Sequence, residues 1–148
     1  MRWIILPVSL ALMSCSSEEV TVVERVPGPP TPERLLYNDI EQNQIFGASC
    51  TFAPSGGGSG AIAIAMLDAG YIKIEGDLLR LVPMIEDQEL GPPEMKFFGD
   101  KYAFVLALNA ESERPHGEGG REYDANLLIT ATDGTRVYDS AGLAQCAA

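Results

Sequence analysis

The chain has 148 residues and carries 21 acidic against 10 basic side chains, which gives a formal net charge of −11. A chain of this length folds as one domain of ordinary size around a single core. Because phosphate backbones and anionic lipid head groups attract Lys and Arg, this excess of carboxylates argues against nucleic acid as a partner and against electrostatic adhesion to a membrane.

The first fourteen residues have the pattern of an export leader. Arg2 gives a minimal positive end, Ile4 to Met13 is an apolar stretch, and Ser14 is a small residue before Cys15. A bilayer-spanning helix needs about 20 apolar residues, so a stretch of about ten fits a signal peptide instead. The alternative, a buried N-terminal helix, is disfavoured by Pro7 and by the polar residues that follow Cys15.

Leu12-Met13-Ser14-Cys15 resembles the lipobox of bacterial lipoproteins, in which an aliphatic, a variable and a small residue precede cysteine. The resemblance implies that residues 1–14 are removed and that Cys15 carries diacylglycerol and an acylated amino terminus, with fatty acids such as palmitate. Ser16 after the cysteine resembles the signal for outer-membrane sorting, which implies the periplasmic face of that membrane. Several acyl chains would anchor the protein firmly in the membrane, because each methylene buried in the bilayer contributes about 0.8 kcal/mol.

The two remaining cysteines are Cys50 and Cys146. Three cysteines are an odd number for an exported chain, and assigning Cys15 to lipid leaves the other two as a disulfide in an oxidising compartment. The alternative is a reactive or metal-bound thiol, but neither residue has a neighbouring His or a second Cys at metal-ligand spacing. The sequence therefore predicts a disulfide that closes almost the whole domain, with no metal and no cofactor.

Residues 15–31 are expected to form a lipidated, flexible tether, and residues 32–148 a single β-rich domain. The stretch from Pro27 to Pro32 is too rich in proline for a helix or a sheet interior. A short helix is expected next, with Thr31 as N-cap and Pro32 at the first helical position. The apolar residues of this helix, at helical spacing, are Leu35, Leu36 and Ile40.

From Ala48 onward the apolar residues follow a period of two, and turn residues recur at hairpin spacing. The clearest expected hairpin has Gly76-Asp77 as its loop. This register sets Ile74 opposite Leu79 and Ile72 opposite Leu81. We disfavour a loop at Glu75-Gly76, because it would set Ile74 against Asp77 and is expected to disrupt the core face.

Three further segments complete the expected sheet. Gly99-Asp100 is expected to turn a second hairpin, and Asp133-Gly134 a third. The second hairpin would set Phe97 opposite Tyr102 and Met95 opposite Phe104. Ala61 to Leu67 is expected to be a strand that follows the glycine-rich loop from Gly56 to Gly60. About seven or eight strands and one short N-terminal helix predict a mainly β fold, a small antiparallel barrel or sandwich whose first and last strands are joined by the disulfide.

His116 is the only histidine, so any mechanism with a histidine base depends on it. The region from Glu111 to Glu122 is rich in Gly and charge and is predicted to be a mobile hairpin loop, not a rigid catalytic platform. His116 could meet a divalent ion together with Glu118, Glu122 and Asp124, but transition-metal sites usually need more than one nitrogen or sulfur ligand. The sequence therefore predicts a protein that is not an enzyme.

Lys73 and Arg80 are a candidate partner contact. In the expected register they lie opposite each other on the solvent face, where like charges destabilise the sheet unless something compensates. Two interpretations stay open: solvated positions that discourage aggregation, or a contact with an anion or a partner.

The function that follows is a lipid-anchored, non-catalytic binding or structural module whose partner is an envelope protein or a cell-wall component. The domain resembles uncharacterised alphaproteobacterial lipoproteins, which implies no activity. It is also similar to membrane-bound inhibitors of C-type lysozyme, through Cys15, the pair Cys50 and Cys146, and the strands from Tyr71 to Leu81. That similarity implies an alternative function as an inhibitor, and an acidic surface suits basic lysozymes. The chain lacks that family's Ser-Gly-x-x-Tyr loop, so no inhibitory residue can be assigned.

Overall fold

The computed structural model describes residues 30–56 and 60–148. Its strands are β1 (Pro32–Glu33), β2 (Ser49–Pro54), β3 (Ala63–Ala65), β4 (Gly70–Ile74), β5 (Asp77–Pro83), β6 (Glu94–Phe98), β7 (Tyr102–Leu108), β8 (Arg114–His116), β9 (Gly120–Ala131) and β10 (Arg136–Ala147). The helical elements are α1 (Tyr37–Gln42) and the single 3-10 turn η1 (Ala110–Ser112).

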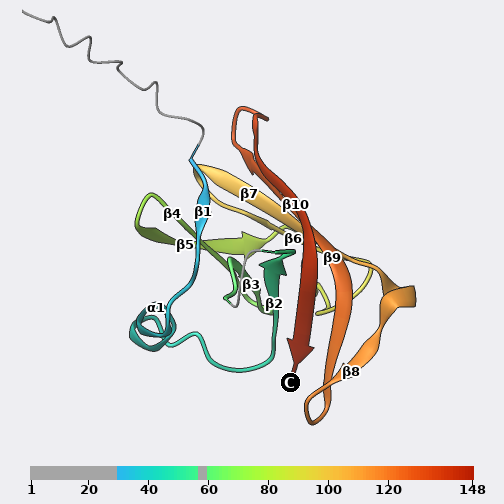
Figure 1. Cartoon of the computed structure of the whole chain (residues 1–148). Coiled ribbons are helices and arrows are strands. Elements are labelled where there is room, and N and C mark those ends of the chain that lie inside the picture. Colours follow the sequence, from blue (N-terminus) through green and yellow to red (C-terminus); the bar gives the residue numbers. More distant parts are fainter. Residues whose placement is uncertain (1–29, 57–59) are drawn as a thin grey trace, which may run out of the picture.

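Eight strands of this part of the chain form a closed antiparallel barrel (Figure 1). Their order is β4-β3-β2-β10-β9-β7-β6-β5, and β5 pairs back onto β4. The predicted mainly β fold with one short helix is confirmed, and of the two expected architectures the barrel is the one found. Closure removes the open sheet edges that a sandwich of this size would leave.

The pairing around the barrel is uneven. β9 and β10 are the longest strands and run side by side along the whole molecule (Figure 1). β5 and β6, in contrast, meet only through Val82 opposite Phe98 and Pro83 opposite Phe97. The short strands β1 and β8 extend the sheet by pairing with the ends of β4 and β9.

The barrel interior is filled by side chains. Phe52, Phe97 and Phe104 are almost completely buried at its centre. Phe97 and Phe104 are direct partners on β6 and β7, with ring centroids 4.9 Å apart. A Cβ on Gly70 would lie 2.6 Å from Cγ of Phe97 and 2.7 Å from Cζ of Phe104, so only glycine fits beside the two rings. The interior is thus a packed hydrophobic core and not a ligand cavity.

The helix begins later than the sequence predicts. Thr31 is not its N-cap, because Pro32 and Glu33 form β1 and pair with the end of β4. α1 begins at Tyr37, and the N–H of Leu36 donates a 2.8 Å hydrogen bond to the carboxylate of Asp39. Proline tolerates an edge strand, so strand pairing overrides the capping signal.

The helix segment covers part of the outer face of the barrel. Leu35 and Ile45, on either side of α1, are buried against Ile64 of β3 in a small second cluster. Ile40 of α1 and Tyr71 of β4 pack at its edge. This cluster fixes α1 beside β3 and β4 (Figure 1).

The register of the β4–β5 hairpin differs from the expected one. Its two loop residues are Glu75 and Gly76, with Ile74 opposite Asp77 and Ile72 opposite Leu79. Glu75 has φ 53° and Gly76 φ 81°, the two positive values that a type I′ turn requires. The expected disruption of the core face does not occur, because moving the loop by one residue shifts the pairing by two and leaves each side chain on its side of the sheet.

The β6–β7 hairpin is displaced by one residue in the other direction. Gly99 donates a hydrogen bond to the carbonyl of Tyr102, so the loop is Asp100-Lys101 and not Gly99-Asp100. Phe97 therefore faces Phe104 and not Tyr102. This register brings the Phe97 and Phe104 rings into direct contact inside the barrel, a favourable aromatic pair.

The last predicted hairpin and the strand predicted after the glycine-rich loop are both present. A turn is present at Asp133-Gly134 as predicted, but the loop also includes Thr132, because the N–H of Ala131 donates a 2.8 Å hydrogen bond to the carbonyl of Thr135. Gly134 has φ 88°, and the carboxylate of Asp133 accepts a 2.8 Å hydrogen bond from the N–H of Thr135. The strand expected over Ala61 to Leu67 is shorter, because only Ala63–Ala65 pair with both β2 and β4. Residues 57–59 of the predicted glycine-rich loop lie outside the described residues.

Candidate functional site

The disulfide between Cys50 and Cys146 is present and joins β2 to β10. The two cysteines are directly opposite each other in neighbouring strands and are separated by 96 positions in the sequence. Cys50 is fully buried at the margin of the core. The predicted disulfide is confirmed, and a reactive or metal-bound thiol at either position is not found.

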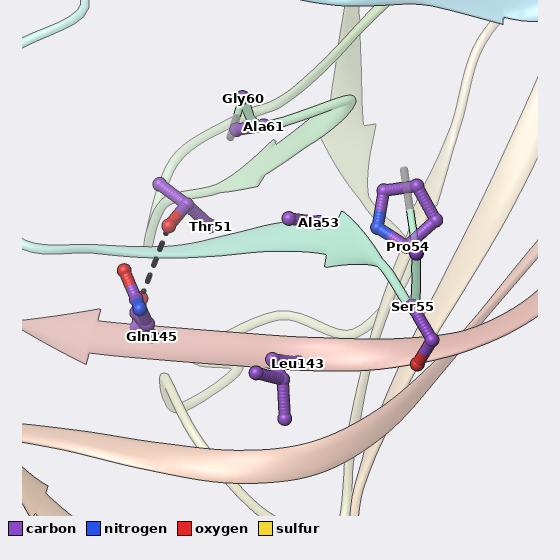
Figure 2. A pocket seen from close by; sticks show the side chains of 9 residues that line it. Thr51, Ala53, Pro54, Ser55, Gly60, Ala61, Leu143 and Gln145 are labelled. Atoms are coloured by element: carbon purple, nitrogen blue, oxygen red, sulfur yellow. Dashed lines mark hydrogen bonds between the residues drawn. The ribbon is translucent and has the colours of Figure 1, made fainter. Parts of the chain in front are cut away.

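Next to the disulfide, a hollow of about 540 Å³ lies on the outer face of the barrel over β2 and β10. Its walls are Thr51, Ala53, Pro54, Ser55, Gly56, Gly60, Ala61, Leu143 and Gln145. Figure 2 shows the Thr51 hydroxyl beside Gln145, whose carbonyl accepts a 3.5 Å hydrogen bond from it. Leu143 and Ala53 are opposite each other in the register and form the apolar part. None of the described lining residues carries a charge.

A network of charged side chains begins at the same edge of β10. Gln145 donates a 2.9 Å hydrogen bond from Nε2 to one carboxylate oxygen of Glu122, and Arg114 donates a 2.8 Å hydrogen bond from Nε to the other. Both hydrogen bonds, that from Gln145 first, lower the pKa of Glu122 below its usual value. Glu122 is therefore held as a carboxylate with both oxygens engaged, an arrangement that suits a structural acceptor and not a general acid.

His116 lies beside this network, in the short hairpin of β8 and β9. A hairpin is found in the region from Glu111 to Glu122 as predicted, and it is formed by β8 and the start of β9, with Arg114 opposite Glu122 and His116 opposite Gly120. Gly117 and Gly119 adopt positive φ and turn the short hairpin, while Pro115 is accommodated because β8 is an edge strand. Nδ1 of the half-exposed His116 is 3.6 Å from Glu122. Within the described residues, no three His, Cys, Asp or Glu side chains are grouped to hold a metal ion.

Lys73 and Arg80 do not form a pair. The observed register sets Lys73 opposite Leu78 and Arg80 opposite Tyr71. Lys73 Nζ lies 3.0 Å from the carboxylate of Asp39. Asp39 has a lowered pKa, first because it accepts the N–H of Leu36 and second because of Lys73.

Arg80 is more exposed than Lys73 and lies 3.8 Å from the carboxylate of Asp68. The electrostatic conflict expected between Lys73 and Arg80 is thus resolved by a separate carboxylate for each. Whether either residue contacts a partner stays a prediction.

Cys15, the leader over residues 1–14 and the tether up to residue 29 lie outside the described residues. In the part of the chain that is described, no helix has the length and apolar character to cross a membrane. No protein-family model matches the chain, and neither curated proteins nor solved structures give a significant match. The class that the fold and the site define is a small, filled, disulfide-linked β-barrel.

Proposed function

We propose that this chain is a lipid-anchored lipoprotein of the bacterial cell envelope, and that its barrel is a non-catalytic binding or structural module facing the periplasm. The observation that carries the proposal is the disulfide between Cys50 and Cys146. Structural disulfides persist in oxidising compartments and are rare in the cytosol, so the bond supports export. Export leaves Cys15 as the unpaired cysteine, at the position where the sequence resembles a lipobox.

Two features of the described residues support binding over catalysis. The barrel interior is occupied by phenylalanine and aliphatic side chains, which leaves the outer surface as the place for contacts. Glu122, whose carboxylate lies 3.6 Å from Nδ1 of His116, is already engaged by Arg114 and Gln145. A general base needs a free lone pair within reach of a substrate proton, and these hydrogen bonds leave Glu122 poorly suited to that role.

Intact-mass analysis of protein extracted from the membranes of a bacterial host tests the anchor. We expect the mass of a chain that starts at Cys15 and carries diacylglycerol and an amide-linked fatty acid. This mass should be lower by two hydrogens than that of the reduced protein, because of the disulfide. The Cys15→Ser variant should lack the lipid and leave the membrane fraction, while a Lys101→Ser variant in the β6–β7 loop serves as a control and should be lipidated normally. Unmodified wild-type protein that retains Met1 would refute the proposal.

An inhibitor of C-type lysozyme is the second candidate. It is favoured by the combination of an eight-stranded barrel, a disulfide that ends in the last strand, and an acidic chain that would attract a basic enzyme. Turnover of a cell-wall suspension by a C-type lysozyme, measured with increasing amounts of this protein, tests it. Saturable inhibition at a one-to-one ratio supports this candidate, and full activity at a hundredfold excess eliminates it.

A further inference from the structure

A groove of about 480 Å³ lies on the outer surface, and its lining residues fall between the two cysteines in the sequence. It forms where the β3–β4 turn, the end of β5, the β5–β6 loop and the end of β6 meet. Its lining is Leu67, Asp68, Pro83, Met84, Ile85, Glu86, Asp87 and Phe98. None of these residues belongs to the hollow over β2 and β10 or to the network around Glu122.

Four large apolar side chains in this groove are exposed to solvent. The exposed fractions are 58% for Leu67, 51% for Met84, 55% for Ile85 and 45% for Phe98. Val82, which is opposite Phe98 in the register, is also exposed and extends the apolar surface along β5. Single exposed apolar residues are ordinary, but a contiguous group of this kind marks an interaction surface.

The groove is held in shape by the backbone beneath it. The N–H of Met84 donates a 2.9 Å hydrogen bond to the carbonyl of Lys96 on β6. The buried side chain of Gln88 accepts a 2.7 Å hydrogen bond from the N–H of Lys96, which fastens the β5–β6 loop a second time. Met84 and Ile85 are thus presented by a fixed loop, and pre-organisation of this kind lowers the entropy lost on binding.

The charges around the groove favour a basic ligand. Three carboxylates, Asp68, Glu86 and Asp87, line it, and no Lys or Arg is among the described lining residues. Two basic side chains on the strands that border the groove already face carboxylates: Arg80 lies 3.8 Å from Asp68, and Lys96 lies 3.1 Å from Glu94. A second copy of this acidic chain and an anionic lipid surface would both be repelled.

We propose that this groove docks a segment of another protein in which apolar side chains are flanked by Lys and Arg. The inference deepens the proposed function as a binding module and rests on it for the existence of a protein partner. The apolar side chains of the segment would fill the space among Leu67, Met84, Ile85 and Phe98. Its basic residues would meet Glu86 and Asp87 at the rim, would share Asp68 with Arg80, and would speed the encounter.

The test uses the full chain in mild detergent and two synthetic amphipathic peptides of equal length, one of Leu and Lys and one of Leu and Glu. Calorimetry should show saturable binding of the Leu/Lys peptide that weakens as salt rises, and at least tenfold weaker binding of the Leu/Glu peptide. The double variant Met84→Ser, Ile85→Ser should lose at least tenfold in affinity for the Leu/Lys peptide. These side chains are exposed, so folding should be preserved, which circular dichroism checks.

Two matched variants separate the contributions. Leu36→Ser with Phe46→Ser removes two exposed apolar side chains from the segments that flank α1 and should leave the affinity unchanged. Glu86→Gln with Asp87→Asn keeps the shape of the groove, because Asn tolerates the positive φ of Asp87, and should reduce both the affinity and its salt dependence.

Four results would overturn the inference. Equal affinity for both peptides would show that the carboxylates do not determine the choice of ligand. Failure of the Leu/Lys peptide to bind would show that the groove is not a binding site for such a segment. Dimerisation that Met84→Ser, Ile85→Ser abolishes would make a second copy the occupant. Groove-dependent binding to vesicles of phosphatidylglycerol would make it a lipid surface. The mass of the protein lipidated at Cys15 is measured separately. A protein without lipid would contradict the proposed anchor, whereas the loss of peptide binding would contradict the proposed groove.

Discussion

Gly70 offers the sharpest test of the packing inside the barrel. In Gly70→Ala the new Cβ would lie 2.6 to 2.8 Å from atoms of Phe97 and Phe104. Ordinary carbon–carbon contact is about 3.5 to 4.0 Å, so two buried rings must move by about 1 Å. Overpacking of this kind typically costs about 1 to 3 kcal/mol, and two displaced rings place the loss near the upper value. At about 4 °C per kcal/mol, the expected fall in Tm is about 10 °C.

Urea unfolding of four proteins measures this effect: wild type, Gly70→Ala, Phe97→Leu and the double variant. Phe97→Leu removes ring atoms that meet the new Cβ, so the double variant should be at least about 1 kcal/mol more stable than the sum of the two single losses predicts. Gly99→Ala is the control, because its Cβ would lie 3.3 Å from Cγ of Leu81 and demands a smaller shift. A loss below about 0.5 kcal/mol for Gly70→Ala, or strict additivity with Phe97→Leu, would refute this packing.

Three further predictions concern the disulfide, a turn and a carboxylate. Replacing both Cys50 and Cys146 by Ser should lower the free energy of unfolding by about 4 to 5 kcal/mol, because the separation is 96 positions, and unchanged urea midpoints with and without reductant would contradict this. Glu75→Asn should raise that free energy by about 1 kcal/mol, because Asn accepts positive φ more readily, and a lower urea midpoint would contradict the turn assignment. Glu122 has a folded pKa below its ordinary value of 4.5, so its contribution to stability is complete above that pH and is lost as pH falls through the lower folded pKa. The stability difference between wild type and Glu122→Gln should therefore shrink in acid, and a constant difference from pH 7 to pH 3 would contradict the network.

The sequence predicts which side chains enter the core better than it predicts which residues face each other. The alternation in β4 and β5 correctly assigns Ile72 and Leu81 to one face. The hairpin register is decided by the backbone of Glu75, which adopts positive φ although its side chain does not favour it. A dipeptide signal such as Gly-Asp locates a turn to within one residue and leaves this choice open.

The site residues show the same division between local and long-range information. The disulfide can be predicted because the number of cysteines leaves a single pairing once Cys15 is set aside. The ion pair between Lys73 and Asp39 could not be predicted from the sequence, because it exists only when α1 packs on the outside of β4. Met84 and Ile85 directly follow β5, and only the fold reveals that this loop presents them to solvent beside Leu67 and Phe98.

The position of the disulfide also determines how the molecule would carry a mechanical load. A pull between the N-terminal segment and the end of β10 enters the barrel through β1, α1 and the start of β2, and then crosses the covalent bond from Cys50 to Cys146. The long stretch between the two cysteines lies outside that force path. Under such a pull, β1 and α1 would detach from β4 and β3 first, and the covalent bond would then carry the load past the strands between the two cysteines.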